Sequence, residues 1–149
     1  MSFAPLTQLD VTHLFQVTGT RNNRTVDAGP AGIRIYTWID EARFEGDRLR
    51  GRVEPGPSTE RATVRPDGVV VSEVHLLLIT DDDAEIVMRY TATAVPTASG
   101  YSVKNFPIFE TADPRYAWLN TVQAVTLYAV ENGEVTPRDV YQINHEGNR

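Results

Sequence analysis

Residues 69–95 read VVVSEVHLLLITDDDAEIVMRYTATAV, two apolar runs separated by an acidic turn. The runs are rich in Val, Ile and Leu, and their boundaries fit two strands. Both faces of the resulting hairpin are largely apolar, as expected of strands with a core on one side and a packing partner or subunit contact on the other. This stretch therefore predicts a β-hairpin that is packed on both faces.

A turn at Asp82 and Asp83 would set the register of this hairpin. One face would then carry four opposed pairs: Ile79 with Ile86, Leu77 with Met88, His75 with Tyr90, and Glu73 with Ala92. A carboxylate, an imidazole and a phenol at one end of an apolar stripe are costly to bury unless they bond to each other or to a ligand. Glu73, His75 and Tyr90 therefore form the first candidate site, which a register shift of one residue would turn outward.

Segments rich in β-branched and aromatic residues recur along the chain, with turn residues between them. They are Leu9–Val17, Gly32–Ile39, Val69–Thr80, Ile86–Val95, Tyr101–Phe109, Leu119–Val130 and Val140–Ile143. Many short strands without amphipathic helical patterns favour an antiparallel sandwich or barrel over an α/β fold. We favour an all-β fold, a single antiparallel β-barrel of about eight strands with short turns.

The sequence Asp113-Pro114 is an N-cap followed by a proline at the first helical position, so we expect at most one helical turn, near residues 113–118. The length of 149 residues fits one domain over residues 1–149. The polar tail 144–149 is expected to be frayed.

Composition excludes several function classes. With 14 Lys and Arg against 20 Asp and Glu, the net charge of −6 has the wrong sign for nucleic-acid binding. The chain lacks cysteine, its three histidines have no ligand-like spacing, and it has neither a P-loop nor a dinucleotide fingerprint. We therefore expect no metal and no cofactor.

The start of the chain lacks the basic and apolar regions of a secretory signal, and the longest apolar run, Val74 to Ile79, is far shorter than the roughly 20 residues that span a bilayer. The expectation is a cytoplasmic protein with no membrane partner.

A second candidate group alternates along residues 33–39. Arg34, Tyr36 and Trp38 share one strand face, and an arginine between two aromatic rings can bind a carboxylate or an enolate. An exposed arginine between interface aromatics explains the same pattern more simply.

Four ordered blocks resemble a known family. They are FETADPRYAWLN at 109–120, FEGDRLRGRVEPG at 44–56, RPDG at 65–68, and Val140-Tyr141. They resemble domain-of-unknown-function family 3237, also described as uncharacterised protein family 0311, which comprises small proteins mainly of bacteria and fungi. The resemblance implies a β-barrel-like fold and no established reaction.

The chain also departs from the family pattern. The Asp-Trp pair usual after Pro-Gly-Gly is missing from residues 55–61, Glu73-Val74-His75 stands where Asp-x-Arg is common, and Lys104 replaces an expected arginine. If these positions line the family's pocket, an always-charged cation has been exchanged for a titratable imidazole, which favours proton transfer over anion binding.

These residues suggest an acid/base enzyme. Glu73 and His75 would transfer protons, and Tyr90 with Lys104 or Arg115 would donate to a developing oxyanion. Glu110 could be a second carboxylate, and Trp118 part of an aromatic wall. In the structural interpretation, Asp113 caps a turn, Arg115 pairs with Glu110, and Trp118 fills the core.

The expected function is binding of a small, partly apolar organic molecule, with activity as a cofactor-independent lyase, isomerase or cyclase on an aromatic or polyketide-like substrate. The alternatives are a non-catalytic binding or accessory protein and a structural subunit of an oligomer. Strand edges and strands that are apolar on both faces favour a homodimer or a higher homo-oligomer.

Overall fold

The computed structural model describes residues 4–144, so most of the tail predicted to be frayed lies outside the described residues. Within this range the chain forms eleven strands and two 3-10 helices. The strands are β1 (Val11–Asp27), β2 (Ile33–Glu45), β3 (Arg50–Val53), β4 (Thr59–Val64), β5 (Val70–Thr80), β6 (Glu85–Pro96), β7 (Gly100–Asn105), β8 (Ile108–Glu110), β9 (Ala124–Glu131), β10 (Glu134–Val135) and β11 (Arg138–Ile143). The helices are η1 (Gly29–Ala31) and η2 (Pro114–Thr121).

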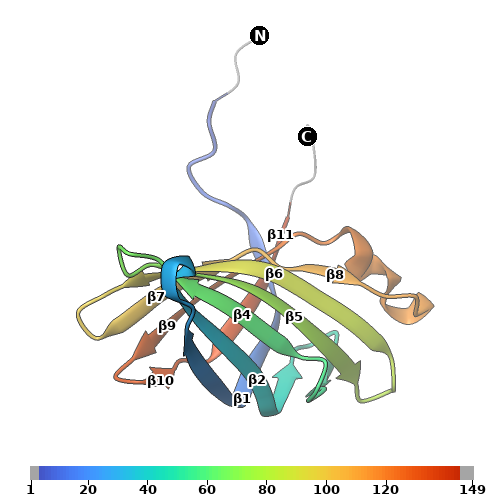
Figure 1. Cartoon of the computed structure of the whole chain (residues 1–149). Coiled ribbons are helices and arrows are strands. Elements are labelled where there is room, and N and C mark those ends of the chain that lie inside the picture. The colour runs from blue at the N-terminus through green and yellow to red at the C-terminus, as the bar shows by residue number, and fades with distance from the viewer. Residues whose placement is uncertain (1–3, 145–149) are drawn as a thin grey trace.

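The sheet closes on itself as a barrel (Figure 1). Its ring of neighbours runs β1, β2, β4, β5, β6, β7, β9 and β11, which returns to β1, and every pairing is antiparallel. The short strands β3, β8 and β10 pair with members of this ring. The predicted all-β barrel of about eight strands is confirmed.

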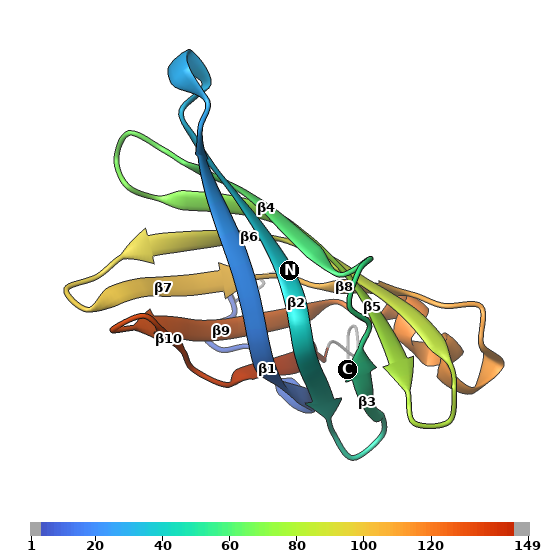
Figure 2. The same ribbon diagram turned by 60° about the horizontal axis from the view of Figure 1, so that its bottom comes forward.

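The longest ladder joins β1 and β2, which pair from Gln16 opposite Glu45 to Asp27 opposite Ile33. This hairpin extends to η1 at its tip (Figure 2). Gly29 and Gly32 enclose the tip with φ of 63° and 89°, a backbone conformation that residues with a Cβ rarely adopt. The strand predicted to end at Val17 thus continues for ten more residues, through a polar segment.

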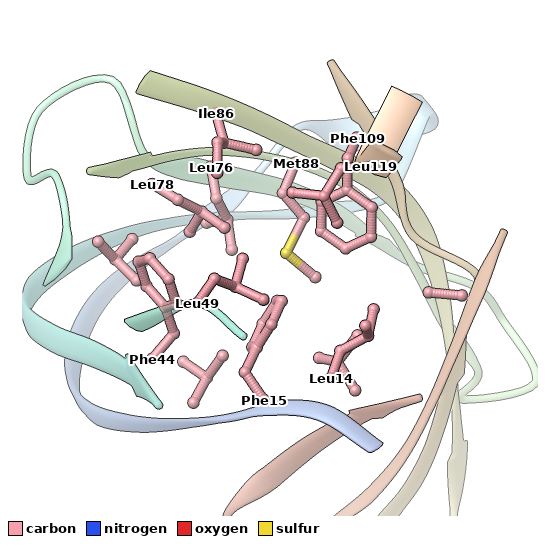
Figure 3. Packing of buried hydrophobic residues seen from close by; sticks show 14 of the residues in the cluster. Leu14, Phe15, Phe44, Leu49, Leu76, Leu78, Ile86, Met88, Phe109 and Leu119 are labelled. Atoms are coloured by element: carbon pink, nitrogen blue, oxygen red, sulfur yellow. The ribbon is translucent and has the colours of Figure 1, made fainter. Parts of the chain in front are cut away.

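One end of the barrel is filled by a hydrophobic core, and we call it the closed end (Figure 3). The fully buried Phe15 contacts Phe44 and Phe109 edge to face, with ring centroids 5.4 and 6.0 Å apart. Leu78 and Ile86, from β5 and β6, are also fully buried in this core. The aromatic cluster of the closed end contains no polar side chain and excludes water from this end of the barrel interior.

The helix η2 is fastened to the turn between β5 and β6. Asp113 accepts a hydrogen bond from the backbone N–H of Arg115 at 2.9 Å, which confirms the predicted N-cap. The Tyr116 hydroxyl donates to Asp82 at 2.8 Å, and Arg115 donates to the Asp82 carbonyl at 2.9 Å. The helix expected near 113–118 is present, but it is longer than the single turn predicted, because the eight residues Pro114–Thr121 form more than two turns of 3-10 helix.

The predicted register of the β5–β6 hairpin is wrong by one residue. Leu78 lies opposite Ile86 and Val74 opposite Tyr90, whereas Tyr90 was predicted opposite His75. The physical reason is the turn: the Thr80 N–H donates to the Ala84 carbonyl across three residues rather than two, and Asp83 adopts φ of 68°. A three-residue loop with a left-handed residue is a common hairpin connection, and it reverses the faces of one strand relative to the expected pairing.

No helix within residues 4–144 has both the length and the apolar character required to cross a bilayer.

Candidate functional site

Between the closed-end core and the opposite end, which we call the open end, the barrel interior is hollow. The space holds about 200 Å³, and small side chains from three neighbouring strands widen it: Ala62, Ser72, Ala92 and Ala94. Two deeper pockets of about 20 Å³ each share lining residues with it. Each is large enough for one water molecule. We call these three neighbouring spaces the barrel cavity.

Three charged side chains line the barrel cavity. Arg21 of β1 lies opposite the buried Ile39, Glu60 of β4 opposite the buried Thr37, and Arg138 of β11 opposite the buried Val17. Strand alternation directs all three inward, because their partners belong to the interior face. Arg21 Nη1 lies 3.9 Å from Glu60 Oε2, and both side chains are about three-quarters covered or more, at 25% and 20% exposed.

Burial raises the pKa of the Glu60 carboxyl, and this effect exceeds the opposing effect of the positive charges of Arg21 and Arg138. A carboxyl with a raised pKa in an apolar-walled cavity holds a proton more readily than one in water, which suits general acid/base chemistry. The structure therefore contains a candidate acid/base group that the sequence prediction did not name.

Two tyrosines complete the polar lining. Burial raises the pKa of Tyr90 on β6 and of Tyr128 on β9, and the neighbouring Tyr128 raises that of Tyr90 further. Both phenols therefore remain protonated near neutral pH and can donate hydrogen bonds into the barrel cavity. Tyr90 is the one member of the predicted catalytic trio that lines this cavity.

At the bottom of the barrel cavity lies a pair of buried polar side chains. Asn105 of β7 and Thr126 of β9 are directly opposite each other and are 1% and 3% exposed. Within residues 4–144 neither polar atom of the Asn105 amide, nor Oγ1 of Thr126, has a hydrogen-bond partner. The same holds for Nε of Arg138.

The structure places the predicted trio on two faces of the sheet, although all three residues border one exterior groove. Glu73 and His75 are exposed on the outer face of β5, opposite Thr91 and Arg89, while Tyr90 faces inward. The expectation that the three share a face is wrong, because the three-residue turn shifts the register. The groove holds about 330 Å³, and its lining includes Glu73, His75, Phe106 and part of Tyr90.

Arg34, Tyr36 and Trp38 share the outer face of β2, as alternation predicted, and none of them lines the barrel cavity. Tyr36 and Trp38 are 45% and 42% exposed. Arg34 donates to the Thr63 hydroxyl at 2.7 Å, so its guanidinium is engaged with the neighbouring strand.

The remaining predicted substrate-binding residues also lie outside the barrel cavity. Lys104 is exposed on β7. Glu110 accepts a hydrogen bond from Arg89 at 2.8 Å, so the predicted pairing of Glu110 with Arg115 is wrong.

Arg115 binds Asp113 and Asp82 instead, at 2.8 and 3.1 Å. Asp113 is the nearer partner because it caps the same helical turn, two residues before Arg115. Trp118 packs partly against the core beneath the Arg48 guanidinium, which is 3.5 Å from the ring centroid. The block at 109–120 therefore builds the closed end of the barrel.

Arg21, Glu60 and Arg138 were missed for a common reason. Each lies on strand residues that were not predicted as strand: the second half of β1, all of β4, and the start of β11. Alternation in Thr59–Val64 places Glu60, Ala62 and Val64 on one face, and this pattern would have indicated an inward carboxylate had the segment been recognised as a strand.

The sequence matches the family model described as "Protein of unknown function (DUF3237)" over residues 9–143. The chain belongs to the DUF3237 family. The resemblance inferred from the sequence blocks is confirmed, and with it the expected β-barrel-like fold. No functionally curated protein matches this DUF3237 chain.

Three solved structures place the fold among known proteins. A β-barrel-like protein from Acinetobacter baumannii AYE is 25% identical, with a TM-score of 0.79 over 97% of this chain and 100% of that one. A protein with unknown function from Clostridium acetobutylicum is 24% identical, with a TM-score of 0.81 over 92% and 100% of the two chains. A structure described as an enzyme from Penicillium herquei is 22% identical, with a TM-score of 0.75 over 96% and 100%.

Proposed function

We propose that this DUF3237 protein is a cofactor-independent acid/base enzyme, a lyase, isomerase or cyclase, that acts on a small, partly apolar organic molecule inside the barrel cavity. The observation that carries the proposal is Glu60, a carboxyl with a pKa raised by burial in the wall of a cavity that can admit a ligand. The similar fungal structure described as an enzyme is consistent with a catalytic member of this fold.

The chemistry follows from the lining. Glu60 removes a proton from a C–H beside a carbonyl, so that the electron pair left behind is delocalised onto the carbonyl oxygen, or from an O–H, so that the pair stays on that oxygen. Tyr90 and Tyr128 remain protonated and donate hydrogen bonds to that oxygen. Glu60 then returns its proton to another position of the same molecule, so an isomerisation or cyclisation balances without a co-reactant, and an elimination releases the leaving group with the proton.

The proposal thus assigns to Glu60 the proton transfer that sequence patterning assigned to Glu73 and His75. A planar substrate suits the widest part of the barrel cavity, because the lining there combines the aromatic rings of Tyr101 and Tyr128 with small alanine side chains. This supports the expectation of an aromatic or polyketide-like substrate.

The test uses 5-nitrobenzisoxazole, a small carbon acid from which any suitably placed base removes the ring C–H proton. The N–O bond breaks as the proton leaves, and the product is the coloured 2-cyano-4-nitrophenolate. We expect a saturable rate that falls by about 10² or more in Glu60→Gln, the loss typical of a removed acid/base group. Glu41→Gln, the same change at an exposed position of β2, serves as the matched control and should keep the wild-type rate.

Two outcomes would overturn the proposal. A rate that survives Glu60→Gln and is lost in Glu73→Gln would move the chemistry to the exterior groove. Saturable binding of the benzisoxazole without product would leave the second candidate, a non-catalytic binding protein, which is favoured by the two arginine charges that oppose protonation of Glu60. Self-association stays a prediction, which the molar mass from light scattering in solution would check.

A further inference from the structure

We propose that the ligand of the barrel cavity is a small apolar or aromatic molecule with a single negative charge, which enters with its charged head first and is bound there by Asn105, Thr126 and Arg138. This inference rests on the proposed function for its location. It adds the charge and orientation of the substrate.

The charge follows from the ionisable side chains that line the cavity. Arg21 and Arg138 each carry a positive charge, and Glu60 carries at most one negative charge. The lining therefore has an excess of one positive charge or, when Glu60 is protonated, two. A buried charge without a counter-charge is costly, so a singly anionic ligand would stabilise this cavity and a cationic one would not.

The orientation follows from the polar atoms without partners. Asn105 and Thr126 are almost fully buried, and their side-chain atoms have no hydrogen-bond partner within the described chain. Both line the same deep pocket as Arg138, whose Nε also has none. Such groups are uncommon in folded proteins and mark a place where a further partner belongs.

The chemistry of these groups defines the head of the ligand. The amide Nδ2, the hydroxyl and the guanidinium Nε offer three donors around a pocket of about 20 Å³, which suits one acceptor oxygen of a carboxylate, or of an ionised phenol or enol. The wider space is lined by Ala62, Ala94, Val103 and Val130, together with the polar Asn23, Ser72 and Tyr101. The body of the ligand would therefore remain in the wider space while one charged oxygen atom reaches the bottom.

The test compares two isosteric probes, 2-naphthoate and 2-naphthamide, whose affinities are measured by isothermal titration calorimetry at neutral pH. We expect the carboxylate to bind at least about tenfold more tightly, the ratio that corresponds to about 1.4 kcal/mol. Arg138→Met should abolish this preference. Arg61→Met, which removes an exposed arginine next to Glu60 on β4, should retain it.

Thr126→Val separates ligand binding from structural support. The change removes a hydroxyl that has no partner and keeps the shape of the side chain, so the melting temperature should stay the same or rise. The affinity for 2-naphthoate should fall by about tenfold. Equal affinities of the wild-type protein for the two probes would overturn the inference, as would a Thr126→Val protein that melts earlier and binds 2-naphthoate normally.

Failure of this inference can be told apart from failure of the proposed function. The benzisoxazole is neutral and needs no anion-binding head group, so its turnover does not depend on Asn105 or Thr126. Turnover that depends on Glu60, with no preference for naphthoate, overturns only the anionic ligand. A preference for naphthoate without any benzisoxazole turnover overturns only the enzyme.

Discussion

Replacement of Phe109 by alanine tests whether the segment after β7 seals the barrel. Phe109 is 3% exposed and packs edge to face on Phe15, whereas Phe106, three residues earlier, is 59% exposed. Truncation of a buried phenylalanine costs about 3–5 kcal/mol, including its aromatic contacts. Truncation of an exposed one usually costs less than about 0.5 kcal/mol. The two variants remove the same atoms from the same segment, so the difference between them measures the burial of Phe109 and its aromatic contacts.

The assay is urea unfolding followed by far-ultraviolet circular dichroism. With a slope of about 2 kcal/mol per molar urea, Phe109→Ala should lower the midpoint by about 2 M, and Phe106→Ala should leave it within about 0.3 M. Typical domains have about 5–15 kcal/mol of stability, so the variant should still fold. Equal midpoints for the two variants would refute the packing argument. So would loss of naphthoate binding in a folded Phe109→Ala protein, because that side chain lies at the closed end.

Of three further predictions, two concern the carboxyl groups of Glu60 and Asp82 and one concerns the close packing at Gly51. Because burial raises the pKa of Glu60, the folded protein binds a proton on this carboxyl more tightly than the unfolded chain does. This proton binding stabilises the fold fully below pH 4.5, the pKa of the group in the unfolded chain, and the stabilisation is lost as the pH rises through the higher pKa of the folded state. The melting temperature of Glu60→Gln in scanning calorimetry should therefore lie above that of the wild type at pH about 8 and approach it at pH about 4. A difference in melting temperature that stays constant with pH would contradict this. Hydrogen bonds from Thr80 and Tyr116 lower the pKa of Asp82. The stability that these bonds contribute is therefore present above pH 3.8, the pKa of the group in the unfolded chain, and is lost as the pH falls through the lower pKa of the folded state. The melting temperature of Tyr116→Phe should lie below wild type at neutral pH and converge with it in acid, and a gap that widens in acid would refute the assignment. Gly51→Ala would place a Cβ 2.0 Å from the Ile79 carbonyl oxygen, so we expect the free energy of unfolding from chemical denaturation to fall by about 1–3 kcal/mol. A variant as stable as the wild type would contradict the close approach of β3 to β5.

Much of the barrel could be predicted from the sequence because its core strands are apolar and its turns are marked. The runs Val74–Leu78 and Ile86–Met88 bury alternate side chains in the core, and burial of this kind leaves a clear pattern in the sequence. The N-cap at Asp113 could be predicted for the same reason: the residue types at a cap are local and few.

The register and the candidate site could not be predicted in the same way. Whether the turn at Asp81–Asp83 holds two or three residues depends on one left-handed residue, and a single residue decides which face every side chain occupies. The second half of β1 is polar on its inner face, where Arg21 and Asn23 line a hollow rather than a core. On β4 the inward Glu60 interrupts the apolar face that Ala62 and Val64 form. Neither segment therefore has the continuous hydrophobic alternation by which strands are recognised.

The aromatic side chains packed at the closed end leave the barrel cavity with an entrance at the open end and none at the closed end. A molecule that enters the barrel cavity must leave by the same end, so a bound ligand has to leave before the next one enters. A long polymer could not be threaded through and could present only its terminus. A single entrance of this kind favours compact molecules that fit the cavity whole, and in the enzyme proposed above accumulated product would compete with substrate for it.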